Sequence, residues 1–123
     1  MILIFTGNEQ LDKDLEKQIK DSRIVYYPEY VLEEQEATVL ITAVQNNKFN
    51  FKEFLFNVRD KNIRVVLLLE NAKVKELPIA LALGIYDIIF DPFTLDEIEN
   101  MAKVPKPFTH ISSYIKEILK IDL

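Results

Sequence analysis

Polar side chains follow the apolar runs of this sequence at the points where strands are expected to end. They are Thr6, Asn8, Thr42, Glu70 and Asp91. Because the carboxyl ends of parallel strands meet at one edge of a sheet, we expect these side chains to cluster. Two carboxylates beside hydroxyl oxygens could bind a hard cation or act as an acid–base pair. The spacing matches no metal motif, so we interpret them as ordinary loop residues and predict no metal site.

Other catalytic and cofactor motifs are absent from the sequence. Gly7 stands alone after the first apolar run, whereas a dinucleotide fingerprint needs three spaced glycines, and no GxxxxGK[ST] loop is present. There is no cysteine. His110 is the only histidine, and without a Ser or Cys nucleophile motif we interpret it as a solvent-facing residue at a helix start. We therefore expect no enzyme activity, no catalytic residue and no cofactor.

Composition limits the class of protein further. A chain of 123 residues fits one domain, and its net charge of −5 argues against nucleic acid as a partner. No apolar run approaches the roughly 20 residues of a membrane span. The start, Met1 to Phe5, lacks the features of a signal peptide and is typical of a first strand at a natural N-terminus. With no cysteine, these features indicate a cytoplasmic protein.

Apolar runs and capping residues predict alternating strands and helices. The expected strands span residues 2–5, 24–27, 38–42, 63–69 and 86–90. Helices are expected after the caps Asn8, Asn50 and Thr94, over residues 72–83 with Pro78 in the first turn, and after a cap at Thr109. Residues 29–36 leave room for a short helix at most. This alternation predicts an α/β fold with a doubly wound, five-stranded parallel sheet.

The stretch from Ala80 to Phe93 carries a resemblance to a known family. It reads as a helix end, a glycine C-cap at Gly84, a buried strand and the turn Asp91-Pro92-Phe93. It resembles the last third of the CheY-like response-regulator receiver domain, which has a Lys-Pro-Phe turn at this point. The resemblance covers residues 1–103. It implies the strand order 2-1-3-4-5 and a cis bond between Asp91 and Pro92.

The same resemblance implies that the phosphorylation machinery of receivers is lost. The acidic pair of receivers falls on Thr6 and Gly7, or at latest Asn8. The phosphoacceptor falls on Thr42, the hydroxyl residue on Leu69 or Glu70, and the lysine on Asp91. A carboxylate in place of the lysine would repel a phosphoryl group. We therefore expect a pseudo-receiver that works without phosphorylation, as a regulatory or localising module for protein–protein interaction or dimerisation.

Residues 104–123 are expected to form a second part, a proline-containing hinge and an amphipathic helix. Together with the partner-binding face of receivers, its apolar stripe gives the candidate interface residues Phe93, Ile111, Tyr114, Ile115, Ile118 and Leu119. The stripe either folds onto its own domain, pairs with a second copy to give a homodimer, or leads into another domain. Degenerate receivers of this kind resemble those N-terminal to MinD/ParA-type ATPases, so an ATPase domain in a longer protein is one expected partner.

Two other functions stay open from the sequence. One is a sensor that binds a small molecule or nucleotide in the crevice at the strand ends. The other is an enzyme with Glu70 and Asp91 as paired carboxylates, which would need one of them to have a raised pKa. We rank the interaction module first and the sensor second.

Overall fold

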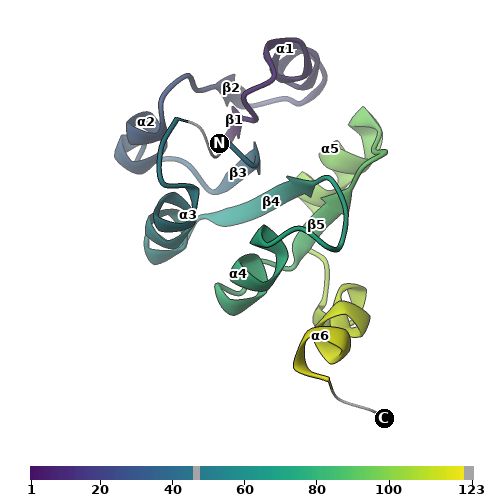
Figure 1. The fold of residues 1–123 in the computed structure, drawn as a ribbon. Coiled ribbons are helices and arrows are strands. Elements are labelled where there is room, and N and C mark those ends of the chain that lie inside the picture. Colours follow the sequence, from purple (N-terminus) through teal and green to yellow (C-terminus); the bar gives the residue numbers. More distant parts are fainter. Residues whose placement is uncertain (46–47, 121–123) are drawn as a thin grey trace.

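The computed structural model describes residues 1–45 and 48–120 and contains one parallel sheet. Its strands run in the order β2-β1-β3-β4-β5, as predicted (Figure 1). The elements are β1 (Ile2–Phe5), α1 (Glu9–Gln18), β2 (Ser22–Ile24), α2 (Pro28–Glu33), β3 (Val39–Ala43), α3 (Phe51–Asp60), β4 (Arg64–Leu69), α4 (Glu76–Ala82), β5 (Asp87–Phe90), α5 (Leu95–Lys103), a short 3₁₀ helix η1 (Phe108–His110) and α6 (Ser112–Leu119). None of the helices in the described residues has the length and hydrophobicity to cross a membrane.

Helices cover both faces of the sheet and divide the core in two. Helices α1 and α5 pack on one face, and α2, α3 and α4 pack on the other (Figure 1). The apolar face of α3 is buried, with Leu55 fully covered, and Leu67 of β4 is fully covered beneath the same helices. Burying a side chain of this size stabilises the fold by about 1.5–3 kcal/mol. The continuous apolar strands are therefore explained by burial on both faces.

Three of the predicted helix caps are confirmed by hydrogen bonds. The side chains of Asn8, Asn50 and Thr94 accept from the backbone N–H groups of residues 11, 53 and 97. Each cap satisfies a donor that the first helical turn leaves unpaired, a contribution of about 1 kcal/mol. Helix α2 is short, which confirms the prediction that residues 29–36 leave room for a short helix at most.

The predicted end of helix α4 is also confirmed. Gly84 has a φ of +73°, and the N–H groups of Gly84 and Ile85 donate to the carbonyls of Leu81 and Ala80. This is a Schellman motif. Pro78 lies in the first turn of α4, and the bond between Asp91 and Pro92 is cis, both as predicted.

Several predicted boundaries are wrong. Helix α4 begins at Glu76 and not at Ala72, and strand β2 begins at Ser22 and not at Ile24. Strand β2 ends at Ile24 and does not reach Tyr27, because its partner β1 ends at Phe5 and leaves nothing to pair with. Thr109 caps no helix: it lies inside η1, and α6 begins at Ser112 after Ile111, which makes no side-chain cap.

The C-terminal segment packs at the β5 end of the sheet. In Figure 1, α6 lies beyond β5, at the side of the sheet opposite β2. Ile111 is fully buried, and the ring of Tyr114 meets that of Phe90 edge-on, with centroids 5.1 Å apart. The start of α6 therefore belongs to the same packed body as the sheet.

Candidate functional site

A cavity of about 510 Å³ lies at the carboxyl ends of β1, β3, β4 and β5. Four of the predicted residues line it, namely Thr6, Asn8, Glu70 and Asp91. Glu76 of α4 also lines it, and apolar side chains from β3, β4, α1 and the loops after β3, β4 and β5, including Phe93, form the remaining walls. The topology thus brings most of the predicted polar cluster together, at the place where receiver domains carry out their chemistry.

Thr42, a predicted member of this cluster, and Gly7, a further position of the predicted degenerate phosphorylation pocket, lie elsewhere. The side chain of Thr42 is fully buried in the sheet, where its hydroxyl donates to the backbone oxygen of Phe5 at 2.7 Å. Gly7 lines a different cavity and packs against Gln45. Thr42 therefore offers no accessible acceptor group to a ligand in the first cavity.

The charged side chains that line the first cavity are all carboxylates. Glu70 and Asp91 are exposed carboxylates, and no lysine or arginine lines the cavity. A transferred phosphoryl group needs cations or a bound metal to offset its charge. Within residues 1–45 and 48–120, no group of three or more carboxylate or histidine side chains is arranged to hold a metal ion.

The sequence-based analysis missed Asp12, which is buried beside this site. Its carboxylate accepts two hydrogen bonds from Thr6, one from the hydroxyl at 2.5 Å and one from the backbone N–H at 3.2 Å. Burial raises the pKa of Asp12, and the bonds from Thr6 partly oppose this. Its spacing could have revealed it: Asp12 is four residues after Asn8 and three before the buried Leu15, so it lies on the inner side of α1.

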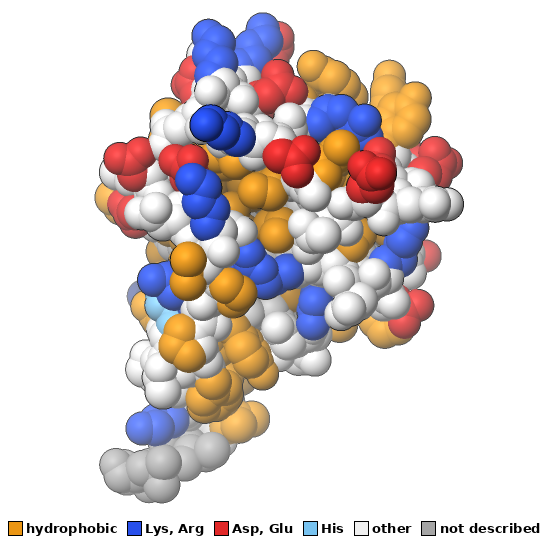
Figure 2. All heavy atoms as spheres, turned by 180° about the vertical axis from the view of Figure 1, so that it is seen from behind, with side chains coloured by type: hydrophobic (Ala, Val, Ile, Leu, Met, Phe, Trp, Pro, Cys, Tyr) orange, Lys and Arg blue, Asp and Glu red, His pale blue; other side chains and the backbone are white. Residues whose placement is uncertain are grey.

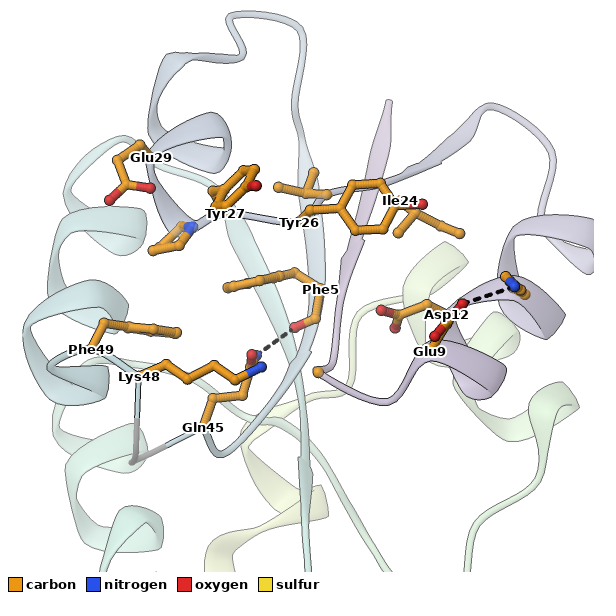
Figure 3. A pocket seen from close by; sticks show the side chains of 14 residues that line it. Phe5, Glu9, Asp12, Ile24, Tyr26, Tyr27, Glu29, Gln45, Lys48 and Phe49 are labelled. Atoms are coloured by element: carbon orange, nitrogen blue, oxygen red, sulfur yellow. Dashed lines mark hydrogen bonds and ion pairs between the residues drawn. The ribbon is translucent and has the colours of Figure 1, made fainter.

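A second cavity, of about 530 Å³, lies at the ends of β1, β2 and β3. Figure 3 shows Tyr26 and Tyr27 on one side of it and Phe5, Phe49 and Gln45 on the other. The early end of β2 creates this cavity, because the chain leaves the sheet after Val25, and Tyr26 and Tyr27 become a wall.

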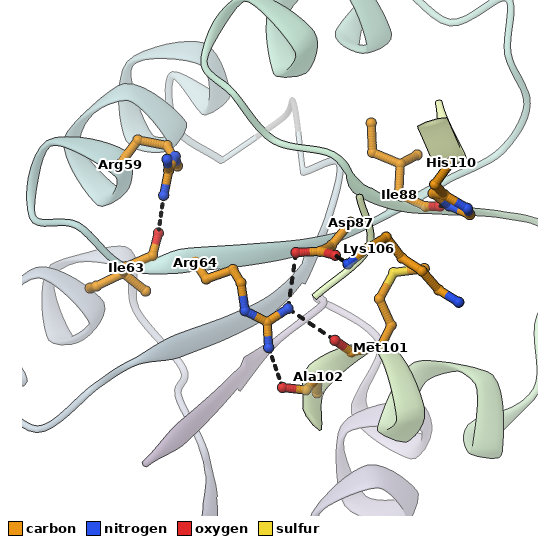
Figure 4. A network of polar contacts seen from close by, with 9 residues as sticks. All are labelled: Arg59, Ile63, Arg64, Asp87, Ile88, Met101, Ala102, Lys106 and His110. Atoms are coloured by element: carbon orange, nitrogen blue, oxygen red, sulfur yellow. Dashed lines mark hydrogen bonds and ion pairs between the residues drawn. The ribbon is translucent and has the colours of Figure 1, made fainter. Parts of the chain in front are cut away.

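A polar network fixes the hinge to the amino-terminal end of β5 (Figure 4). Arg64 of β4 forms an ion pair with the buried Asp87 at 2.9 Å and also donates to the backbone oxygens of Met101 and Ala102 at the end of α5. Asp87 accepts the N–H of Lys106. Sequence reasoning did not single out Arg64 or Asp87.

His110 also contacts the sheet. Its side chain is exposed, in agreement with the expected solvent-facing position, but its Nε2 lies 3.1 Å from the backbone oxygen of Ile88. Strand β5 is an edge strand, so this carbonyl has no neighbouring strand on its outer side. The imidazole of His110 hydrogen-bonds this carbonyl oxygen and covers part of the open edge of β5.

The candidate interface residues divide into three groups by burial. Ile111 is fully buried inside the chain, so it is a core residue and not an interface residue, in line with the alternative that the stripe folds onto its own domain. Tyr114, Ile115 and Phe93 are half-buried. Ile118 and Leu119 remain exposed, by 41% and 61%. Figure 2 shows hydrophobic side chains gathered over the C-terminal part of the chain, next to the grey residues.

No family model and no curated protein matches the chain. Several solved structures are similar to the chain. The receiver domain of the Francisella response regulator 1452 is 14% identical, with a TM-score of 0.68 over 83% of this chain and 92% of that domain. A receiver domain protein (CheY-like) from Methanospirillum hungatei is 14% identical, with a TM-score of 0.68 and coverage of 94% and 96%.

A third similar structure is a response regulator from Burkholderia pseudomallei with a phosphorylated aspartic acid, a calcium ion and citrate. It is 15% identical, with a TM-score of 0.68 over 99% of this chain and 75% of that one. These similarities show that the chain has the CheY-like receiver-domain fold.

Proposed function

We propose that this chain is a pseudo-receiver that works without phosphorylation as a regulatory or localising protein–protein interaction module. The observation that carries the proposal is the state of Thr42, on which the phosphoacceptor position falls according to the resemblance to receivers. Its hydroxyl is buried and donates to Phe5. The neighbouring cavity supplies carboxylates and no cation, so it lacks the groups that phosphoryl transfer requires.

The exposed end of α6 is the proposed contact surface. Ile118 and Leu119 lie there, and Val104 and Phe108 are further exposed hydrophobic residues in the C-terminal segment. Large exposed apolar groups in one region favour a role in association. The occupant we propose is a second copy of this chain, so that the protein is a homodimer; an ATPase domain in a longer protein is the alternative partner.

Loss of phosphorylation can be tested with Mg²⁺ and beryllofluoride, which mimics a bound phosphoryl group. We expect no saturable change in the backbone amide NMR signals around Thr6, Thr42 and Asp91. A saturable change confined to those residues would refute the phosphorylation-independent role.

The association surface can be tested by light scattering. The double substitution Ile118→Glu and Leu119→Glu should convert a dimer into a monomer that is still folded, since both side chains are exposed within one chain. The matched control is Phe56→Glu, which alters an exposed aromatic residue on α3. A monomeric unsubstituted protein, or equal loss of dimer in the control, would contradict self-association through α6.

A further inference from the structure

The second cavity has the size and the walls of a small-molecule site. Its volume of about 530 Å³ falls within the range of roughly 300–1,000 Å³ that is usual for such sites. It lies on the β2 side of the sheet and shares no lining residue with the cavity that holds Glu70 and Asp91. It is therefore a different cavity from the one at Glu70 and Asp91, although Gly7, one of the positions of the predicted degenerate phosphorylation pocket, lines it.

Aromatic rings stand on opposite sides of this cavity (Figure 3). Phe5 and Phe49 are stacked, with ring centroids 5.8 Å apart and planes inclined by 19°. Tyr26 and Tyr27 stand across the opening and are 69% and 59% exposed. Two adjacent tyrosines with this exposure contribute little to the core, and their rings offer flat apolar surfaces to a planar ligand.

One wall is shaped around a glycine. Gly7 has a φ of +80°, and a Cβ built on it would lie 2.9 Å from Oε1 of Gln45. The absence of a side chain at Gly7 lets the Gln45 amide lie against the backbone, where its Nε2 donates to the oxygen of Phe5 at 3.1 Å. The Oε1 atom has no donor among the described residues and can accept a hydrogen bond from a ligand.

The charges that line the cavity nearly cancel. Glu9 forms an ion pair with Lys13 at 2.9 Å, and the carboxylate of Asp12 accepts a hydrogen bond from the hydroxyl of Thr6. The remaining charged lining residues are one carboxylate, Glu29, and one ammonium group, Lys48. With three carboxylates and two ammonium groups around it, the cavity supplies no surplus of cations for a polyphosphate.

We propose that this cavity binds a planar heteroaromatic molecule without net charge and of nucleoside size. Its ring would lie between the tyrosines and the Phe5–Phe49 pair, and Gln45 would accept a hydrogen bond from its edge. This site does not depend on the interaction role of the C-terminal helix, because no residue of η1 or α6 lines it.

The proposal is tested by titrating the full chain with adenosine, guanosine and cytidine while backbone amide NMR signals are recorded. We expect at least one nucleoside to cause saturable shifts at Gly7, Val25 to Tyr27 and Gln45, with a dissociation constant of about 1 mM or below. The matching 5′-triphosphate should bind at least about 5-fold more weakly, because the cavity cannot neutralise its charge.

Two variants test whether the nucleoside binds in this cavity. Tyr27→Ala removes an exposed wall residue and should weaken nucleoside binding at least about 5-fold while the amide spectrum stays that of a folded protein. Phe56→Ala removes an equally exposed aromatic side chain outside the cavity and should leave binding unchanged.

Four results would overturn the proposal: no saturable shift with any of the three nucleosides, shifts that map to another surface, undiminished binding by Tyr27→Ala, or tighter binding of the triphosphate. Each of these concerns the cavity alone, so failure here is distinguishable from failure of the dimer test.

Discussion

The backbone N–H of Lys106 donates a hydrogen bond of 2.6 Å to a carboxylate oxygen of Asp87, and the other oxygen of Asp87 accepts from Arg64 at 2.9 Å. The buried carboxylate of Asp87 thus binds both Arg64 on the neighbouring strand β4 and the backbone of Lys106 in the hinge that leads to α6. The proline-containing hinge is therefore fixed to the sheet, and the direction in which α6 leaves the domain depends on Asp87.

The first prediction concerns this carboxylate. Asp87→Ala should lower the free energy of unfolding by about 2–4 kcal/mol, because it leaves the mostly buried guanidinium of Arg64 without its ion partner. Urea denaturation measures the loss. The matched control is Asp96→Ala on the exposed side of α5, which should cost less than about 1 kcal/mol. Equal losses of stability in the two variants would show that the ion pair between Asp87 and Arg64 stabilises the fold no more than an exposed carboxylate does.

The second prediction separates the buried and exposed ends of the C-terminal stripe. Ile111→Ala should destabilise the chain by about 2–4 kcal/mol, because Ile111 is fully buried, whereas Leu119→Ala should change the stability by less than about 0.5 kcal/mol. Thermal unfolding at low protein concentration measures both. If Ile111→Ala is neutral, this segment does not pack on the sheet in solution.

Most of the fold could be predicted because local signals agree with the tertiary structure. Asn8, Asn50 and Thr94 cap the helices that follow them, and Gly84 ends α4, since each of these roles depends on a few neighbouring residues. Four strands were placed from apolar runs to within one or two residues. The strand order required the resemblance to receivers, because spacing does not specify which strands pair.

The missed features depend on contacts between distant residues. Tyr26 and Tyr27 have high strand propensity, yet they leave the sheet because β1 is too short to pair with them. The ion pair between Arg64 and Asp87 becomes visible only when β4 and β5 are known to be neighbours. For the candidate site, the cluster of Thr6, Asn8, Glu70 and Asp91 followed from topology, whereas the inward direction of the Thr42 hydroxyl did not.

The third prediction is a pH dependence from Asp12. Burial raises its pKa in the folded state above the unfolded value of about 3.9, so its favourable contribution is present below that pH and is lost as the pH rises through the folded-state pKa. Asp12→Asn stays neutral and avoids this loss. The stability of the variant relative to the unsubstituted protein should therefore increase between pH 3 and pH 7.

Urea denaturation at several pH values checks this, because titration of all other carboxylates cancels in the difference. Asp14→Asn is the matched control, since Asp14 lies on the same helix and hydrogen-bonds with the exposed Gln10. A difference for Asp12→Asn that stays constant or shrinks as the pH rises would mean that burial does not dominate at this carboxyl.

The fourth prediction tests the turn that leads into β5. At Gly84 a Cβ would meet no atom closer than Nη2 of Arg59 at 3.7 Å, so Gly84→Ala creates no clash and reports only the cost of a positive φ. That cost is about 1–2 kcal/mol for alanine, while asparagine adopts this conformation more readily. Gly84→Asn should therefore lose less stability than Gly84→Ala in urea denaturation. Equal losses would indicate that contact with Arg59, and not backbone conformation, limits the residue at this position.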